Sequence, residues 1–307
     1  MRVLVTGSAG HLGEALMRRL GGVGLDVLPS AYTTIVGSIT DRAVVARAME
    51  GCDAVIHAAT LHKPHVATHS RQQFIDVNLT GTLNLLEEAA ARSVRAFVFT
   101  STTSTFGDAL TPAVGAPAAW IDETVVPVPK NIYGVTKVAA EDLCELAARN
   151  QKLPVVVLRT SRFFPEEDDN AEMRLDQWNA KTNELLYRRV ELEDIVDAHV
   201  LAVEKARGFR TYIISATSPF TREDLPLLRM DAAAVVRRHV PDFEALYAAR
   251  GWQMFPSIDR VYRNDRARAE LGWAPKIDFA TAVTRLGNGQ DWRSELAISV
   301  GAKGYHR

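Results

Sequence analysis

Apolar positions in the first half of the chain follow two periods in alternation. Short runs rich in β-branched residues cover Val3–Thr6, Val23–Leu25, Thr34–Val36, Ala54–His57, Ala96–Thr100 and Val155–Arg159. Between them, apolar residues recur at helical spacing over Glu14–Leu20, Ala43–Met49, Leu79–Ala91 and Val135–Asn150. Strands that alternate with helices predict an α/β fold in which a parallel sheet carries helices on both faces.

The pattern loosens after the last of these strands. Phe163–Asp169 shows no clear period and ends in an acidic run, so we interpret it as a loop on the substrate side of the protein. Helical spacing returns over Val190–Lys205, and Tyr212–Ser215 is typical of a further strand. The remainder contains several helical pieces separated by prolines.

Composition and charge restrict the possible functions. The 307 residues are 47% hydrophobic and 24% charged, which is typical of one large globular domain with a smaller addition. A net charge of -1 argues against nucleic acid or an anionic membrane as a partner. Cys52 and Cys144 lie far apart, which argues against a disulfide framework or a zinc site. Because Met1 is followed by no long apolar stretch, we expect a cytoplasmic protein.

A glycine-rich turn directly follows the first strand. Its three glycines permit a tight turn and let a pyrophosphate approach the N–H groups at the start of a helix. Asp26 lies nineteen residues after Gly7, where its carboxylate would bind the adenosine ribose of a dinucleotide. This carboxylate repels a 2′-phosphate, and no Lys or Arg follows between Val27 and Ile39, so we expect NAD rather than NADP. The alternative is an ordinary turn beside a surface Asp.

A Tyr and a Lys four residues apart, Tyr133 and Lys137, begin a predicted helix. This spacing places both on one face, where the ammonium can stabilise a phenolate. Lowering the pKa of a phenol from ~10 to ~7 requires about 4 kcal/mol, which one unit charge at about 4 Å supplies at an effective dielectric of 20. Lys137 together with an oxidised nicotinamide could therefore lower the pKa of Tyr133. The alternative is a packed Tyr beside a surface-directed Lys.

A run of hydroxyl side chains, Thr100–Thr105, ends the strand before this helix. With it, the chain resembles the extended short-chain dehydrogenase/reductase family, also called the NAD-dependent epimerase/dehydratase family. The resemblance covers nearly the whole chain and rests on Thr6–Gly13, Val36–Ile39, Ile56–Ala59, Asn78–Thr82, the hydroxyl run ending at Gly107, Tyr133/Lys137, Leu192–Val196 with Ala198-His199, and Leu271–Pro275.

The resemblance implies a fold and a set of roles. The fold is a Rossmann-type doubly wound parallel sheet from residues 1–160, to which 190–216 return, with a small substrate-binding subdomain formed by 161–189 and 217–307. Thr102 would hydrogen-bond the reacting hydroxyl, Tyr133 would be the general acid or base, and Lys137 would lower its pKa and hold the nicotinamide ribose. The implied cofactor-binding residues are Gly7, Gly10, His11, Leu12, Gly13, Asp26, Ser38, Ile39, Ala58, Ala59, Thr60, Asn78, Tyr133 and Lys137.

Two further inferences come with the family. A homodimer is implied, formed through the helices at Leu79–Ala91 and Val135–Asn150. Asn78 stands where the family has an Asn near the site, but it also immediately precedes Leu79, so an N-cap role in that helix stays open.

Several positions depart from the family pattern. Thr103-Ser104 replaces the Asp-Glu pair with which sugar-nucleotide dehydratases eliminate water, which disfavours dehydration. Ser38 replaces an Asp that faces adenine in many members. Arg162 stands where nucleotide-sugar enzymes often have an Asn, and Phe163–Arg189 is short for a nucleotide clamp. A guanidinium there suits the carboxylate or phosphate of a smaller sugar, although an ion pair with Glu166–Asp169 is an equal alternative.

Three histidines, His62, His65 and His69, follow the fourth strand. No carboxylate lies between them and hydride transfer needs no metal, so we expect no metal site. His62 or Lys63 is a better candidate for hydrogen-bonding substrate hydroxyls. The predicted substrate-binding residues are Thr102, Thr103, His62, Lys63 and Arg162.

The leading hypothesis is an NAD-dependent enzyme that oxidises a secondary or anomeric hydroxyl of a sugar or sugar acid. Release of the product would make it a dehydrogenase, whereas return of the hydride to the other face would make it an epimerase, and the sequence leaves both outcomes open. The alternatives are a UDP-hexose-type nucleotide-sugar 4-epimerase and a non-catalytic NAD-binding scaffold or sensor.

Overall fold

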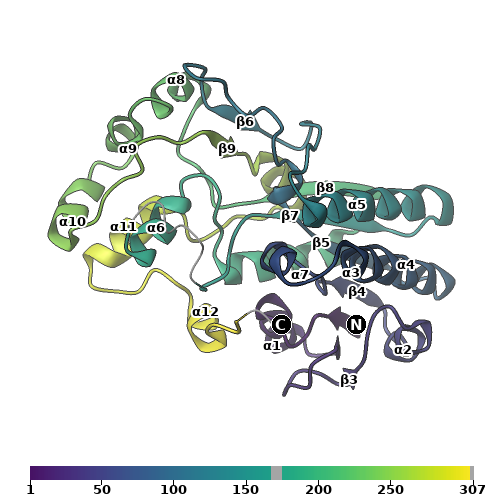
Figure 1. The fold of residues 1–307 in the computed structure, drawn as a ribbon. Coiled ribbons are helices and arrows are strands. Elements are labelled where there is room, and N and C mark those ends of the chain that lie inside the picture. The colour runs from purple at the N-terminus through teal and green to yellow at the C-terminus, as the bar shows by residue number, and fades with distance from the viewer. Residues whose placement is uncertain (167–174, 305–307) are drawn as a thin grey trace.

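The computed structural model describes residues 1–166 and 175–304, and it contains one large parallel sheet (Figure 1). The seven strands lie in the order β3-β2-β1-β4-β5-β7-β8, and each neighbouring pair is parallel. They are β1 (Val3–Thr6), β2 (Val23–Asp26), β3 (Ile35–Val36), β4 (Ala54–His57), β5 (Ala96–Thr102), β7 (Val155–Thr160) and β8 (Phe209–Ile214). The predicted α/β fold with a doubly wound parallel sheet is confirmed.

Helices cover both faces of the sheet because alternate strand residues point to opposite sides. Val3 and Val5 of β1 pack with α1 (His11–Leu20) and α7 (Leu192–Lys205) in one core. Leu4, between them, belongs to the opposite core. That core is covered by α2 (Arg42–Ala48), α4 (Gly81–Ala91) and α5 (Ile132–Gln151). A late helix, α12 (Glu295–Val300), packs on α1 and α7.

The predicted helix at Leu79 begins earlier in the structure. Ser70 caps α3 (Arg71–Ile75), accepting a hydrogen bond from the Gln73 N–H while the Gln73 side chain accepts one from the Ser70 N–H. A π-helical segment, η2 (Asp76–Thr80), joins α3 to α4 without a break. Leu79 therefore lies inside a continuous helical run that begins at Arg71.

A second core lies beside the large sheet. It gathers apolar residues from five helices: α6 (Gln177–Glu184), α8 (Leu225–Leu228), α9 (Ala232–His239), α10 (Phe243–Arg250) and α11 (Phe279–Gly287). A two-stranded parallel sheet of β6 (Ala119–Ile121) and β9 (Arg260–Tyr262) adjoins it. Strands of three residues are too short to show a period, so the sequence pattern did not reveal them. We propose that residues 1–160 and 190–216 form the dinucleotide-binding domain, and that 161–189 and 217–307 form the substrate-binding subdomain.

The described residues also form four short helical turns: η1 (Lys63–Ala67), η3 (Thr103–Thr105), η5 (Arg222–Asp224) and η6 (Ala267–Leu271). Within residues 1–166 and 175–304, no helix combines the length and apolar character needed to cross a membrane.

Candidate active site

The glycine-rich turn brings α1 very close to β1. A Cβ atom on Gly13 would lie 1.8 Å from the Gly7 carbonyl oxygen, and one on Gly7, whose φ is +77°, would lie 2.8 Å from the Ala59 nitrogen. Gly10 is the N-cap of α1 and has no side chain to accept from the first-turn N–H groups. Helix α1 therefore starts at His11, three residues before the predicted start, and directs its N–H groups to where a pyrophosphate would bind.

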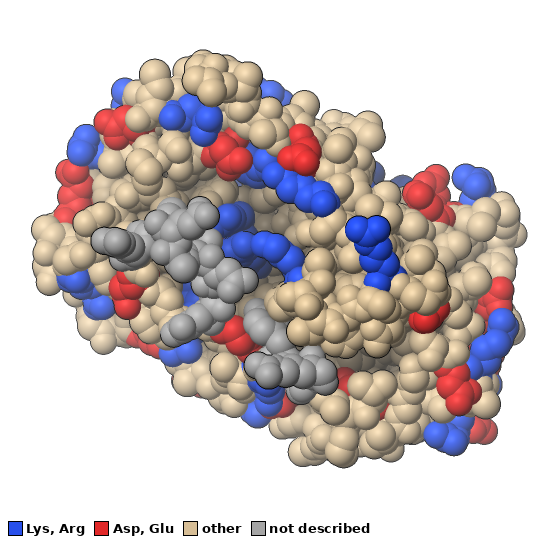
Figure 2. Space-filling model, in the orientation of Figure 1, with Lys and Arg blue, Asp and Glu red and all other residues tan. Residues whose placement is uncertain are grey.

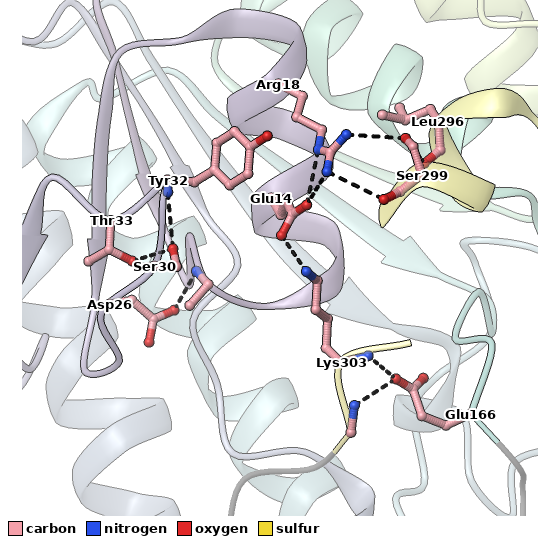
Figure 3. Close-up of polar contacts among 12 residues, drawn as sticks. Glu14, Arg18, Asp26, Ser30, Tyr32, Thr33, Glu166, Leu296, Ser299 and Lys303 are labelled. Carbon is pink, nitrogen blue, oxygen red and sulfur yellow. Dashed lines mark hydrogen bonds and ion pairs between the residues drawn. The ribbon is translucent and has the colours of Figure 1, made fainter. Parts of the chain in front are cut away.

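Asp26 ends β2 beside this turn (Figure 3). Its Oδ2 accepts a hydrogen bond of 2.9 Å from the Ala9 N–H, and its Oδ1 accepts one of 3.0 Å from the Leu28 N–H. The carboxylate thus lies beside the glycine-rich turn, and both of its oxygens are held in place by backbone N–H groups. Its binding of an adenosine ribose stays a prediction.

Two predicted adenine-side residues lie further along this edge. The Ser38 hydroxyl contacts the Thr40 hydroxyl at 2.8 Å and accepts from the Thr40 N–H, so it is held in a local turn. Ile39 is buried against Gly81, where a Cβ atom would come within 2.5 Å of the Ile39 side chain. Ser38 is therefore held by its own turn, and Ile39 belongs to the packed interior; their contact with an adenine stays a prediction.

The residues after β4 are tied to the turn and to η2. The Ala59 N–H donates to Thr6 Oγ1 at 3.2 Å, and the Thr60 hydroxyl donates to Asn78 Oδ1 at 2.9 Å. Ala58, the first residue after β4, donates its N–H to the Thr6 carbonyl. This arrangement brings the predicted cofactor-flanking segment alongside Gly7, where Ala59 leaves no room for a larger residue at position 7.

Asn78 connects three elements and is not a helix N-cap. Its Oδ1 also accepts from the Leu61 N–H at 2.8 Å, and its Nδ2 donates to the Leu61 carbonyl at 2.9 Å and to Thr136 Oγ1 at 3.0 Å. The N-cap alternative is wrong because the helix continues through η2. Asn78 instead fixes the loop after β4 against the helix that carries Tyr133.

The three predicted catalytic residues come together at the carboxyl end of the sheet. Thr102 is the last residue of β5, and Tyr133 and Lys137 lie in the first turns of α5, whose N-cap is Asn131. The side chains of Tyr133 and Lys137 are buried, and the Thr102 hydroxyl lies close enough to the Tyr133 phenol to lower its pKa. Thr103, a predicted substrate contact, is buried in η3.

Lys137 alone does not lower the pKa of Tyr133 in the structure. Burial raises the pKa of Tyr133 to about 12, and the nearby Thr102 hydroxyl offsets only part of this rise. The Lys137 ammonium donates to the Thr100 carbonyl at 2.6 Å and lies 4.0 Å from the centre of the Phe99 ring. Burial lowers the pKa of Lys137 to about 7. The lysine charge is thus weakened by burial and directed to the end of β5.

A buried ion pair lies one helical turn after Lys137, and sequence reasoning missed it. Glu141 accepts from the Arg159 guanidinium at 2.7 Å and from the Ser101 hydroxyl at 2.5 Å. These contacts join α5 to β7 and β5. The signal was present as the four-residue step that places Tyr133, Lys137 and Glu141 on one helix face.

The loop after β7 crosses the carboxyl edge of the sheet. The ring of Phe163 stacks on His11 with 6.0 Å between centroids and 9° between planes, and Phe164 lies 5.4 Å from His62. The loop therefore contacts residues that follow both β1 and β4. Burial lowers the pKa of His11 to about 4.

The histidine-containing loop folds as η1. The His62 N–H donates to Nδ1 of His65 at 3.0 Å, and Lys63 is exposed. His65 and His69 lie 4.9 Å apart between ring centroids. In the part of the chain that the structure describes, no three His, Cys, Asp or Glu side chains are grouped to hold a metal ion.

Among the described residues, Arg162 pairs with Glu184, a carboxylate outside the expected cluster Glu166–Asp169. It donates to Glu184 Oε1 at 3.0 Å, and the same carboxylate pairs with Arg188 and Arg189 at 2.8 Å each. Glu184 lies on α6, which the sequence pattern did not predict, and Glu167–Asp169 lies outside the described residues. Arg162 lies two residues beyond Thr160, the register partner of Thr102.

Known proteins match this chain over most of its length. The model of the NAD dependent epimerase/dehydratase family matches residues 3–215. A UDP-glucose 4-epimerase of Rhizobium meliloti is 28% identical over 342 residues, covering 95% of this chain and 98% of that protein. An L-arabinose 1-dehydrogenase (NAD(P)(+)) of Haloferax volcanii is 31% identical over 184 residues, covering 56% of this chain and 71% of that protein.

Solved structures show the same fold. A short-chain dehydrogenase/reductase superfamily protein from Agrobacterium tumefaciens with bound NAD has a TM-score of 0.65 and 24% identity, and the match covers 94% of this chain and 98% of that one.

The contact between Gly13 and Gly7 leads to a first prediction. Gly13→Ala should destabilise the fold by about 1–3 kcal/mol and abolish NAD binding, because its Cβ atom would force α1 away from the Gly7 carbonyl. Thermal melting and NAD titration measure the two effects. Gly287→Ala is the control, since its Cβ atom would meet nothing within 4 Å. Normal NAD affinity in Gly13→Ala would contradict the assignment.

Proposed function

The chain belongs to the NAD-dependent epimerase/dehydratase family, and from that premise we propose that it oxidises a secondary or anomeric hydroxyl of a sugar or sugar acid. It is an enzyme of a family whose cofactor is NAD. The observation that carries the proposal is the closeness of the Thr102 hydroxyl to the Tyr133 phenol, whose pKa it lowers, with buried Lys137 one helical turn further along α5, at the edge where open α/β sheets bind ligands.

The proposed roles follow from these side chains. Thr102 and Tyr133 hold the substrate hydroxyl between them, and Tyr133 accepts its proton as the phenolate. NAD supplies the hydride acceptor when bound. Lys137 keeps a positive charge near the phenol and binds the nicotinamide ribose, and Asp26 binds the adenosine ribose. The glycine turn, through Gly7, Gly10 and Gly13, holds the pyrophosphate.

We propose that the substrate is anionic. Arg162 lies one strand away from Thr102 and two residues further along, and its side chain is 29% exposed. A guanidinium at this place suits a carboxylate or phosphate, and the one that Arg162 provides also pairs with Glu184. Figure 2 shows Lys and Arg side chains in a hollow on the face that it presents. Thr103, His62 and Lys63 are the further proposed substrate contacts.

Two outcomes of the same first step compete. The resemblance to an L-arabinose 1-dehydrogenase supports release of the oxidised sugar, and the resemblance to a UDP-glucose 4-epimerase supports return of the hydride. We favour the dehydrogenase because Arg162 replaces the Asn common in nucleotide-sugar enzymes. The non-catalytic scaffold is disfavoured because Thr102, Tyr133 and Lys137 are all present and adjacent.

A homodimer is proposed through α4 and α5. Both helices expose apolar side chains, with Leu83 at 38%, Val135 at 48% and Leu146 at 42%, and α4 packs against α5. Grouped exposed apolar residues are typical of an interaction surface.

A cytoplasmic location is proposed as well, since Cys52 and Cys144 are free thiols.

Cofactor preference follows from Asp26. NAD should bind at least about tenfold more tightly than NADP, because a 2′-phosphate would lie against the carboxylate. Fluorescence titration with NADH and NADPH measures this ratio. Asp26→Asn should lower the ratio of the affinity for NADH to that for NADPH, because it weakens NADH binding and strengthens NADPH binding. Equal affinities in the natural protein would reject the role given to Asp26.

The base role of Tyr133 gives a pH dependence. The phenolate fraction grows about tenfold per pH unit below the pKa of Tyr133, so the rate of oxidation should rise with pH above neutrality. Tyr133→Phe should lower kcat by about 10²–10⁴-fold and remove this rise, while NADH binding persists. An unchanged kcat in Tyr133→Phe would sink the proposal and favour a scaffold.

The identity of the substrate is tested with a panel of neutral sugars, sugar acids, sugar phosphates and nucleotide sugars, read at the NADH absorbance band. Net NADH formation on anionic sugars is expected. Arg162→Gln should raise KM for these by about tenfold or more with little change for neutral sugars. Arg92→Gln, in an exposed pair with Glu88, is the control. Isomer formation without NADH would establish the epimerase instead.

A further inference from the structure

The described part of the loop after β7, Ser161–Glu166, lies beside the glycine-rich turn (Gly7–Gly13). Its Phe163 stacks on His11 of α1, and its Phe164 contacts His62 after β4. In the sheet order, β4 and β5 stand between β1 and β7. The loop therefore reaches from the end of β7 to residues that follow β4 and β1. A cofactor held at the glycine-rich turn would lie beside this loop.

A segment more than a hundred residues later holds this loop in place. The N–H groups of Lys303 and Gly304 donate to Glu166 Oε1 at 2.8 and 3.1 Å, and the Lys303 ammonium pairs with Glu14 Oε2 at 2.5 Å (Figure 3). Glu14 belongs to the first turn of α1. Residues 303–304 thus connect the loop after β7 to α1, the helix that follows the glycine-rich turn.

This segment has a firm anchor. The Ser294 hydroxyl donates to Glu191 Oε1 at 2.8 Å, which fixes the start of α12 at the start of α7. Arg18 donates to the Ser299 hydroxyl at 3.2 Å and pairs with Glu14 at 2.6 Å. The same guanidinium lies 5.3 Å from the ring centre of Tyr32, in the loop after β2. The contacts therefore extend from the adenosine side of the turn to the loop after β7.

The carboxylates of Glu166 and Glu14 are buried, so the contacts that they make with residues 303–304 stabilise the position of the loop. Glu166 Oε2 is buried and has no hydrogen-bond partner among the described residues, so the Lys303 and Gly304 N–H groups supply the hydrogen bonds that this carboxylate receives. The side chain of Glu14 is only 7% exposed and lies between Arg18 and Lys303. A buried carboxylate that loses a cationic partner is destabilised, so loss of the Lys303 charge weakens the attachment.

We propose that Lys303 is a positioning residue that latches the loop Ser161–Glu166 to α1 and thereby slows the release of the cofactor. The latch does not touch the proposed catalytic residues. It acts on the opening of the loop, a step that often limits turnover in enzymes that must exchange their cofactor. The proposal rests on NAD at the glycine turn and is independent of which sugar is oxidised.

The test compares four forms of the full chain. Lys303→Met removes the ion pair with Glu14, Lys303→Arg restores a cation, and Glu166→Ala removes the acceptor of the two backbone N–H groups. Lys276→Met is the matched control, because Lys276 pairs with Asp197 at 2.8 Å on α7. The dissociation rate of NADH is measured by stopped-flow displacement with excess NAD, alongside thermal melting of each variant.

NADH should dissociate about threefold to tenfold faster from Lys303→Met and Glu166→Ala, with Lys303→Arg within about twofold of the natural protein. Lys276→Met should release NADH at the natural rate. Unchanged release in Lys303→Met, or equal acceleration in Lys276→Met, would overturn the latch. Equal acceleration in Lys303→Arg would overturn it too, since the ion pair would then not matter. Failure of the natural protein to bind NADH would instead refute the cofactor site of the proposed function.

Discussion

The buried ion pair between Glu141 and Arg159 is the contact on which the site depends. It lies between α5 and β7, and the Ser101 hydroxyl joins the same carboxylate from β5. Breaking a buried pair by removing one partner typically costs about 3–5 kcal/mol, so the helix is held firmly in this rotation. Because Tyr133 lies two turns and Lys137 one turn before Glu141, the pair directs both toward the end of β5. Thr102 is already there through the register of β5 with β7.

The same burial that positions these groups opposes their charge. Raising the pKa of Tyr133 from 10.0 to about 12 corresponds to about 3 kcal/mol against the phenolate, and the pKa of Lys137 falls to about 7. A single lysine that is itself only partly protonated near neutrality does not offset this cost. In the proposed mechanism, the oxidised nicotinamide would supply a second positive charge close to the phenol when NAD is bound. This proposal couples deprotonation of the substrate to the presence of the cofactor in its oxidised form.

Residues with strict local requirements were predictable from the sequence. The contact between Gly13 and Gly7 admits only glycine, and the positions of Asp26, Thr102 and Tyr133 at strand and helix ends follow from the alternating pattern. Contacts between distant segments were not predictable. Arg162 pairs with Glu184 on a helix whose polar sequence gave no clear period, and Asn78 lies in a π-helical segment that resembles a helix start. The attachment of Lys303 to Glu14 spans almost the whole chain, and no local pattern encodes it.

The central claim is that Tyr133 becomes acidic enough to act as a base only beside the bound cofactor. The direct measurement is the pKa of this phenol, from the tyrosinate difference spectrum between the natural protein and Tyr133→Phe, titrated with and without saturating NAD. The expected result is a midpoint near 12 without NAD and below about 10 with it. A midpoint that NAD leaves unchanged, or no tyrosinate signal attributable to Tyr133 up to pH 12 with NAD bound, would contradict the account.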